Sequence, residues 1–300
     1  MSDSRRAHPA APPLLDRAAI RRYAAKASAN YDESAVLAEQ LRDQMIGRLD
    51  WINFTPEAIL DLGCGTGHGA ADLAARWPNA RIVALDASSD MLREAAKRED
   101  TSRIEWLLGD AEALPLPEAG FDLVFSNLML PWCEDLDAVF AEVARVLKPR
   151  GLFSFTTFGP DTLLELRAAW RAVDEASHVH PFTDMHDLGD GLVRAGFSEP
   201  VLDVTRYTLT YPDVDALMRD LKAIGAQNAS SGRGRGLTGR GPMQAMAAAY
   251  ESFRARGVLP ASHEVVFGQA WGALERPDSK REGEFSFPVS DIGRREPRGR

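Results

Sequence analysis

The chain has 300 residues, of which 45% are hydrophobic and 26% charged, a composition that is typical of globular proteins and excludes wholesale disorder. Its 35 basic and 44 acidic side chains give a net charge of -9, which disfavours a general binder of nucleic acids or membrane surfaces. The two cysteines are too few for a disulfide framework, and no apolar run approaches the ~18 residues of a membrane-spanning helix. We therefore expect a cytoplasmic protein with neither a nucleic acid nor a membrane as its partner.

The N-terminal region divides into a tail and a helical segment. Residues 1–13 are polar and rich in proline, so we expect a disordered tail. The pair Arg5-Arg6 also occurs in twin-arginine export signals, but prolines and charges interrupt the apolar segment that such a signal needs. Apolar residues at helical spacing predict N-terminal helices over residues 14–50, with Asp32 as a candidate start signal.

Residues 55–158 form the predicted core, in which strands and helices alternate. Such alternation predicts an α/β fold whose parallel sheet has helices on both faces and binds its ligands at the carboxyl ends of the strands. We expect five strands and three helices, the strands at residues 58–62, 81–86, 104–110, 121–127 and 152–158, and the helices at residues 68–76, 88–98 and 135–147.

After residue 158 the alternation stops. Helical insertions are expected at about residues 160–182 and 213–256, another helix ending at Gly196, and strands at 201–211 and 263–273. Within the second insertion, the glycine-rich and arginine-rich segment SSGRGRGLTGRGP predicts a flexible basic loop. The charged residues 277–300 predict a second, mostly disordered tail, so the folded domain is expected to extend from residue 14 to residue 276.

The glycine-rich segment DLGCGTG, residues 61–67, follows the first predicted strand and opens a helix. Glycines allow the backbone to turn tightly and to approach a ligand, and the unpaired N–H groups of a helix start suit an anionic group. A P-loop would need a Lys-Ser/Thr pair after the last glycine, but His68-Gly69 follows it. A dinucleotide-binding loop would need its third glycine at position 68, which is a histidine.

Three acids at strand ends favour S-adenosylmethionine (SAM) as the ligand. Asp61 stands two residues before the first glycine and can pair with the ammonium of SAM while loop N–H groups meet its carboxylate. Asp86 would bind the ribose hydroxyls, and Asp110 would accept a hydrogen bond from the adenine amino group, whose ring Met91 would cover. The predicted cofactor-binding residues are Asp61, Gly63, Gly65, Gly67, Asp86, Met91, Asp110, Ala111, Asn127 and Leu128.

Two sets of segments resemble known families. DLGCGTG, LDASSDML, GDAEALP, FDLVFSNLMLPW and VLKPRG together resemble the class I SAM-dependent methyltransferases over residues 58–158. RRYAAKASANYDESA, FTTFGPDTLLELRAAWRAVDEASHVHPF, YPDVDALMRDLKAIGAQNA and LTGRG are similar to the malonyl-[acyl-carrier-protein] O-methyltransferases of biotin synthesis, so that this second resemblance spans roughly residues 20–272.

The resemblance implies a Rossmann-like sheet of seven strands in the order 3-2-1-4-5-7-6, with strand 7 (263–271) antiparallel and a helical lid formed by the insertions. It also implies SAM as the cofactor and malonyl-loaded acyl carrier protein as the substrate, with malonyl-CoA as a second candidate. The expected product is the malonyl methyl ester that primes pimeloyl and biotin synthesis.

Other reactions remain open at this point. The segments HPFTDMHDLGDGLVRAGF and FSFPVSDIGRR also resemble a mitochondrial complex I assembly factor that is credited with arginine hydroxylation on the same fold. The alternatives are therefore a protein-modifying hydroxylase or assembly factor, another small-molecule SAM methyltransferase, and a SAM-binding module without turnover.

A malonyl thioester would present a free carboxylate to the methyl group of SAM. This carboxylate is ionised at pH 7, so no general base is required and catalysis reduces to positioning in a dry pocket. The resemblance places Tyr31 in an aromatic lid over cofactor and substrate, with Tyr23 as the next choice. Asn127 and Leu128 end the fourth strand, where methyl acceptors bind in this fold.

A cation is expected to orient the substrate carboxylate, and arginine suits this because its planar fork matches a carboxylate. Arg167, just beyond the fifth strand, is the leading candidate, and a solvated helix arginine is the alternative interpretation. His178, His180 and His186 are further candidates, and His180 resembles a residue of the family's loop. Three histidines within nine residues also suggest a metal, but no carboxylate pattern accompanies them, so we expect no metal.

The basic loop contains Arg233, Arg235 and Arg240. Because acyl carrier proteins are acidic, we expect these three arginines to dock the carrier through salt-sensitive contacts that steer the encounter. An unstructured, solvated loop is the alternative interpretation.

Overall fold

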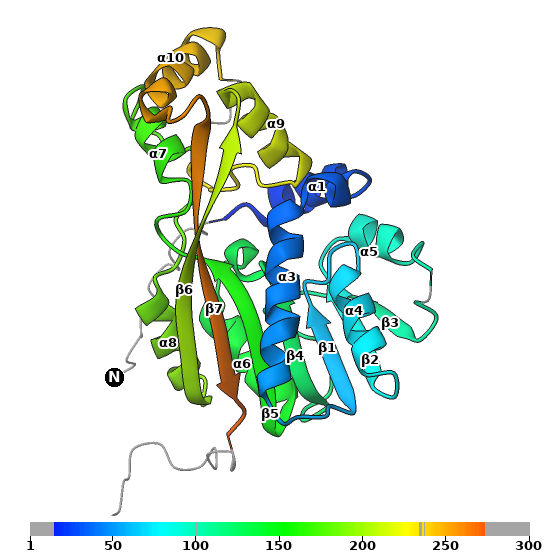
Figure 1. Ribbon diagram of the computed structural model, residues 1–300. Coiled ribbons are helices and arrows are strands. Elements are labelled where there is room, and N and C mark those ends of the chain that lie inside the picture. The colour runs from blue at the N-terminus through cyan, green and yellow to red at the C-terminus, as the bar shows by residue number, and fades with distance from the viewer. Residues whose placement is uncertain (1–14, 100, 234–235, 237, 274–300) are drawn as a thin grey trace, which may run out of the picture.

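A computed structural model describes residues 15–99, 101–233, 236 and 238–273. Both predicted tails, residues 1–13 and 277–300, lie outside the described residues. Figure 1 shows a central sheet with helices on both faces and, at its upper end, a group of helices into which two long strands extend. Among the described residues, no helix combines the length and the apolar character needed to cross a membrane.

Within the described residues the sheet has seven strands in the order β3-β2-β1-β4-β5-β7-β6. Strand β7 runs antiparallel to both of its neighbours, whereas the pairs among β1 to β5 are parallel. The expected strand order and the antiparallel strand 7 are therefore confirmed. The strands are β1 (Ala58–Leu62), β2 (Arg81–Asp86), β3 (Ile104–Leu108), β4 (Phe121–Asn127), β5 (Leu147–Phe158), β6 (Ser198–Tyr211) and β7 (Leu259–Trp271).

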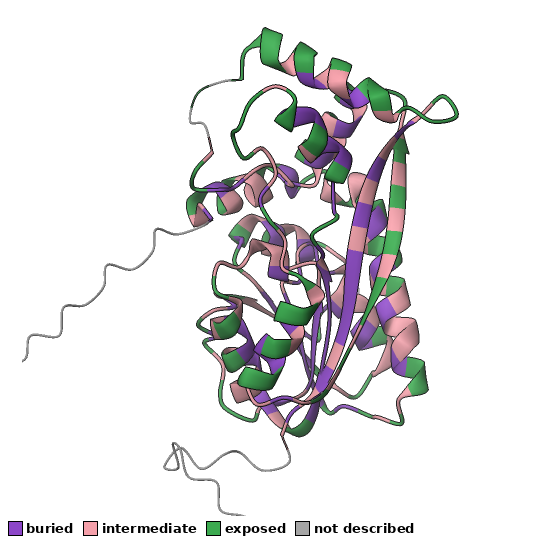
Figure 2. Ribbon diagram, turned by 90° about the vertical axis from the view of Figure 1, so that its left-hand side faces the viewer, coloured by how far each residue is buried: buried purple, intermediate pink, exposed green. Residues whose placement is uncertain are grey.

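The buried apolar side chains of the sheet form two clusters, one on each face, because successive side chains of a strand point to opposite sides. Helices α6 and α8 cover one face, and α3 and α4 cover the other. Figure 2 shows the buried residues concentrated in the strands between these helices. The covering helices are α3 (Val36–Arg48), α4 (His68–Arg76), α6 (Leu136–Val146) and α8 (Met185–Arg194).

A third core cluster lies beyond the sheet, in the helical cap. Strands β6 and β7 extend past the carboxyl ends of the parallel strands and pack there against α7 (Leu164–Arg171), α9 (Val214–Ala223) and α10 (Arg240–Tyr250) (Figure 1). The Tyr250 side chain is fully buried in the cap, and its hydroxyl donates a hydrogen bond of 2.8 Å to the Pro260 carbonyl. The cap therefore has an apolar core of its own, facing the strand ends.

Three further helices are α1 (Arg17–Ala27), α2 (Tyr31–Ser34) and α5 (Ser89–Ala95). Side chains cap the first and the last of these, since the Asp16 carboxylate accepts from the Ala19 N–H and the Ser88 hydroxyl from the Met91 N–H. Single 3₁₀ turns occur at η1 (Leu49–Trp51), η2 (Leu130–Trp132) and η3 (Glu251–Phe253).

Several element boundaries differ from the sequence prediction. Strand β5 begins at Leu147 and not at residue 152, because Leu147 pairs with Phe121 and the segment that was expected to end a helix continues as strand. Strand β7 begins at Leu259 and not at residue 263, since its first residues pair with the end of β6. Helix α7 begins at Leu164 and not at residue 160.

Asp32 is not a helix start. It lies inside α2, where Asn30 occupies the N-cap position, and its carboxylate is turned toward the glycine loop. The prediction treated Asp32 as a local capping signal, but its partners are more than thirty residues away in the sequence, which local patterns do not reveal.

Candidate active site

A cavity of about 940 Å³ lies between the carboxyl ends of the parallel strands and the helical cap. Its walls include the glycine loop, the ends of β2 and β4, helices α1 and α2, and the cap segments around residues 176–182 and 221–228. Asp61 lines a neighbouring cavity of about 110 Å³. Tyr31, Gly63 and Gly65 line both this small cavity and the large one. The position matches the expectation that ligands of such sheets bind beyond the carboxyl ends of the strands.

The glycine loop turns sharply at the end of β1. Gly63 and Gly65 have φ angles of +78° and +53°, and the N–H of Gly63 donates to the Leu85 carbonyl at 2.8 Å. Both glycines line the cavities, whereas Gly67 lines neither. A Cβ atom on Gly67 would lie 2.7 Å from Trp106, so this glycine serves the packing at the start of α4 and does not face the cavity.

Asp61 is buried to 2% exposure at the end of β1. Its Oδ2 atom has no hydrogen-bond partner among the described residues. Burial, together with the nearby Asp86 carboxylate, raises the pKa of Asp61 to about 7. A hydrogen bond from the Ala70 N–H lowers this pKa, but its effect is smaller. A buried carboxylate with an unpartnered oxygen calls for an external donor, and a positively charged one would also lower its pKa.

Asp86 is held by two backbone groups at the end of β2. Its Oδ2 accepts from the Gly65 N–H at 2.9 Å and its Oδ1 from the Ser88 N–H at 2.8 Å. Burial raises the pKa of Asp86, and these backbone hydrogen bonds act in the opposite direction. Because a carboxylate offers about four lone-pair sites, two remain for hydroxyl donors from the cavity. Asp86 lines the large cavity, as do Met91 and Ala111.

Asp110 also lines the large cavity, but its carboxylate already has partners. Oδ2 accepts from Arg17 Nη1 at 2.9 Å, and Oδ1 accepts from the Glu112 N–H at 3.0 Å. The guanidinium of Arg17 also contacts the carboxylates of Glu112 and Glu134. Asp110 therefore has a charged protein partner beside its remaining acceptor sites, and the sequence reasoning missed this partner, Arg17, which lies 93 residues away on α1.

Asn127 is the last residue of β4, and Leu128 follows it. The Asn127 amide is fixed, since its Nδ2 donates to the Ala38 carbonyl at 2.8 Å and its Oδ1 accepts from the Thr156 hydroxyl at 2.7 Å. Leu128 has a φ of +57°, and its N–H donates to the Thr156 carbonyl at 3.1 Å. Both residues line the large cavity, and their positions are set by α3 and β5.

Tyr31 lies on α2 against both cavities. Burial, with a smaller contribution from the Asp86 and Asp32 carboxylates, raises the pKa of its phenol to about 12, so the hydroxyl stays protonated and can donate a hydrogen bond. The adjacent Asp32 accepts from the Thr66 hydroxyl at 2.6 Å and contacts His68 Nε2 at 2.9 Å. Asp32 thereby ties α2, and Tyr31 with it, to the glycine loop.

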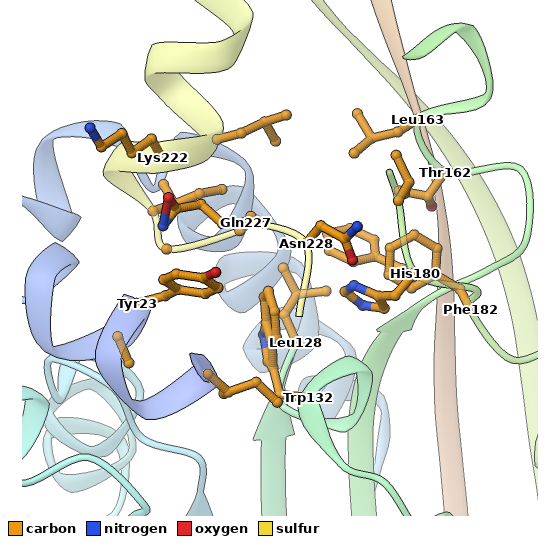
Figure 3. A pocket seen from close by; sticks show the side chains of 18 of the residues that line it. Tyr23, Leu128, Trp132, Thr162, Leu163, His180, Phe182, Lys222, Gln227 and Asn228 are labelled. Atoms are coloured by element: carbon orange, nitrogen blue, oxygen red, sulfur yellow. The ribbon is translucent and has the colours of Figure 1, made fainter. Parts of the chain in front are cut away.

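The cap side of the cavity is aromatic, as Figure 3 shows with the side chains of Tyr23, Trp132, His180 and Phe182 around Leu128. His180 is 6% exposed, and its ring lies 5.4 Å from that of Trp132 and 4.8 Å from that of Phe182, centre to centre. Its Nε2 has no hydrogen-bond partner among the described residues. Burial, with a smaller contribution from the Arg167 charge, lowers the pKa of His180 to about 4, so the imidazole is neutral at pH 7.

Arg167 is not among the residues that line the cavity. Its Nη2 donates to the backbone carbonyl of Pro160 at 2.5 Å and to that of Thr162, and burial lowers its pKa. The guanidinium thus stabilises the turn that precedes α7, which corrects the expectation that Arg167 faces the substrate.

The other two histidines of the predicted loop have separate partners. His178 stacks on Trp170 at 3.6 Å between ring centres and contacts Asp174 at 2.9 Å, while the exposed His186 contacts Asp184 at 2.7 Å. Within the part of the chain that the structure describes, no group of three or more His, Cys, Asp or Glu side chains has metal-binding geometry.

The two described arginines of the basic loop, Arg233 and Arg240, have different surroundings. Arg233 points inward, where its Nη2 pairs with Asp16 at 2.7 Å and its side chain lines the cavity. Arg240 is exposed as the first residue of α10, and Arg235 lies outside the described residues. The structure therefore makes Arg233 part of the contact between the loop and the start of α1.

Comparison with known proteins first identifies the class. Residues 59–151 match a family model described as a methyltransferase domain. The structure is similar to that of a SAM-dependent methyltransferase from Thermotoga maritima, with a TM-score of 0.50 and 16% sequence identity. The match covers 84% of this chain and 97% of that chain, and at this identity it shows a shared fold. The sheet order, the glycine loop and the match to the methyltransferase family model together define a class I SAM-dependent methyltransferase, with SAM as its cofactor.

Curated relatives identify the family more narrowly. A malonyl-[acyl-carrier protein] O-methyltransferase from Methylovorus sp. is 50% identical over 265 residues, which cover 86% of this chain and 90% of the relative. That of Laribacter hongkongensis is 48% identical over 274 residues, covering 88% and 92%. The chain belongs to the malonyl-[acyl-carrier protein] O-methyltransferase family.

Proposed function

We propose that this protein transfers a methyl group from SAM to the free carboxylate of a malonyl thioester on acyl carrier protein, giving the methyl ester that primes pimeloyl and biotin synthesis. The observation that carries the proposal is the continuity of the large cavity, whose walls include Gly63 and Asp86 at one end and the neutral, buried His180 at the other. The names of the relatives support this substrate and favour methyl transfer over hydroxylation or an assembly role.

The residues at the strand ends fit SAM. The unpartnered Oδ2 of Asp61 suits the ammonium group, and the left-handed backbone of Gly63 and Gly65 allows the methionine end to approach the loop. Asp86 retains acceptor sites for the ribose hydroxyls, and Met91 and Ala111 offer an apolar surface for adenine. Asp110, held by Arg17, would contact the adenine amino group only through its remaining lone pairs.

His180 takes the place of Arg167 as the proposed partner of the substrate carboxylate. Its neutral imidazole has a single N–H, which the ring donates to the Pro131 carbonyl. A shift of this proton to the unpartnered Nε2 would let the ring donate one hydrogen bond to the anion without neutralising it, so that the carboxylate stays nucleophilic. The aromatic side chains of Tyr23, Tyr31 and Trp132 exclude water from this part of the cavity. Asn127, fixed between α3 and β5, keeps the end of β4 in position beside the acceptor.

SAM supplies an electrophilic methyl group, which a carboxylate oxygen takes, so that the methyl ester and S-adenosylhomocysteine are formed. A carboxylate anion and a sulfonium cation thereby become two neutral groups. An apolar cavity favours this loss of charge, because the reactants lose more solvation on entry than the products do. The chain therefore needs to position the carboxylate and exclude water, and it needs no proton transfer.

The carrier protein is the proposed partner. Malonyl-CoA, the second candidate from the sequence, has no support in the names of the relatives, which specify the carrier. The cytoplasmic location expected from the sequence stays a prediction.

The test is to incubate the purified protein with SAM and malonyl-loaded carrier protein and to measure the intact mass of the carrier. We expect a mass increase of one methylene group that mild base reverses, without a requirement for oxygen or a reductant. Carrier bearing an acetyl group, which has no free carboxylate, is the matched control. Modification of both carriers, or a mass increase of one oxygen atom, would refute carboxyl methylation.

A further inference from the structure

Helices α1 and α9 lie next to each other at one side of the large cavity (Figure 1). The turn that follows α9 packs directly on α1, since a Cβ atom on Gly225 would lie 3.3 Å from the Tyr23 carbonyl oxygen. Side chains from both helices line the cavity, including Tyr23 from α1 and Leu221 from α9. The two helices therefore adjoin each other and both contribute to the wall of the cavity.

The exposed surface of these two helices is cationic. Five exposed basic side chains belong to it, and none has an ion-pair partner among the residues that the structure describes. We call them the α1–α9 cationic face, which consists of Arg21, Arg22, Lys26, Arg219 and Lys222.

The two helices themselves carry few acidic side chains. Helix α1 contains no acidic residue. Helix α9 contains Asp220, whose carboxylate accepts from the Tyr211 hydroxyl at 2.5 Å, and the exposed Asp215. Asp16, which precedes α1, is paired with Arg233. The face is thus a local positive region on a chain whose net charge is -9.

The cationic face also surrounds an opening of the cavity. Arg21 and Lys222 are exposed and at the same time line the cavity, so they stand where it meets the solvent. Figure 3 shows Lys222 on α9 above Tyr23 on α1, with Trp132 on the other side of the Tyr23 ring from Lys222. Tyr23 and, at the end of β4, Leu128 line the same cavity as Arg21 and Lys222.

We propose that the α1–α9 cationic face docks the acidic carrier protein, so that the carrier's thioester arm enters the cavity past the exposed side chains of Arg21 and Lys222. This inference rests on the proposed function and replaces the basic loop as the docking surface. The overall negative charge of the chain repels an acidic protein, and a cationic region beside the opening orients the encounter. Each exposed charge pair contributes little to the binding energy, and salt screens it. The cationic face should therefore mainly speed the association of carrier and enzyme, by an amount that falls as the ionic strength rises.

The test reverses the charges that lie outside the cavity. The triple variant Arg22→Glu, Lys26→Glu, Arg219→Glu changes three exposed residues that do not line it. At low salt we expect kcat/KM for malonyl-carrier to fall about tenfold or more, mainly through KM. Activity with the malonyl thioester of N-acetylcysteamine, which carries no protein, should stay within about twofold of the wild type. Added salt should lower the carrier kcat/KM of the wild type and affect the triple variant much less.

A matched control carries the same change of charge elsewhere. Arg103, Arg150 and Arg256 are exposed, have no ion-pair partner among the described residues and lie in other elements. Reversal of these three to Glu should leave the carrier kcat/KM within about twofold of the wild type. The single variant Lys26→Glu gives an independent comparison in which one charge of the face is reversed.

The outcomes are distinguishable. An unchanged carrier kcat/KM in the triple variant overturns the docking proposal, as does an equal loss in the matched control. An equal loss with both substrates in Lys26→Glu overturns it as well, because docking concerns the carrier alone. If the wild type methylates neither substrate, the proposed function fails, and the docking proposal fails with it.

Discussion

The ionisation of Asp61 should govern the affinity for SAM. Burial and the Asp86 carboxylate raise the pKa of Asp61 to about 7, so the group is mostly protonated below pH 7 and mostly ionised above it. Only the ionised form attracts an ammonium group. For a pKa of about 7, the ionised fraction falls about 25-fold between about pH 7.5 and pH 5.5, so the dissociation constant of SAM should rise by the same factor.

Calorimetric titration with SAM across this pH range measures the effect. The variant Asp61→Asn should bind SAM about tenfold more weakly at pH 7.5 and show an almost flat pH profile. Methylthioadenosine lacks the ammonium and the carboxylate of SAM, so it should bind the wild type with little pH dependence. The reasoning is refuted if methylthioadenosine shows the slope of SAM, or if Asp61→Asn retains that slope.

The same group affects the stability of the protein without cofactor. Because the folded-state pKa of Asp61 lies above its unfolded value, the native state holds a proton that the unfolded state has lost between about pH 4 and pH 7. The free energy of unfolding therefore loses the contribution of Asp61 as the pH rises from about 4 to about 7, and keeps it at lower pH. Bound ammonium removes the penalty of the ionised form, so SAM should raise the melting temperature more at pH 7.5 than at pH 5.5.

Three further changes test other parts of the site. His180→Ala should raise KM for the malonyl thioester about tenfold in steady-state kinetics and leave the affinity for SAM unchanged. The wild-type rate should show no titration of the His180 imidazole between about pH 5 and pH 8, because its pKa is about 4. Gly63→Ala should lower the free energy of unfolding by about 2 kcal/mol or more in a urea titration, since the new Cβ would lie 2.3 Å from Met129 Cγ at a φ of +78°. Asp32→Ala removes the acceptor of the Thr66 hydroxyl and should weaken SAM binding about fivefold by calorimetry, a small factor because Asp32 is partly exposed.

Much of the fold could be predicted from the sequence. The alternation of apolar strands and amphipathic helices between residues 55 and 158 predicts the parallel part of the sheet, and β1, β2 and β4 have the expected bounds. Strand order and the antiparallel β7 came from the family resemblance. The ends of β5 and β7 were missed because pairing with neighbouring strands extends them past the point where the local pattern stops.

The sequence by itself predicts a cofactor site at one edge of the sheet, because a glycine turn and acids at consecutive strand ends are local features that parallel pairing brings together there. Only the tertiary structure decided which of these groups are free. Asp61 keeps an unpartnered oxygen, whereas Asp110 is held by Arg17 from α1. Arg167 turns to backbone carbonyls and leaves His180 facing the cavity. The availability of a charged side chain depends on which distant residues pack against it, and burial and pairing of that kind exist only in the folded chain.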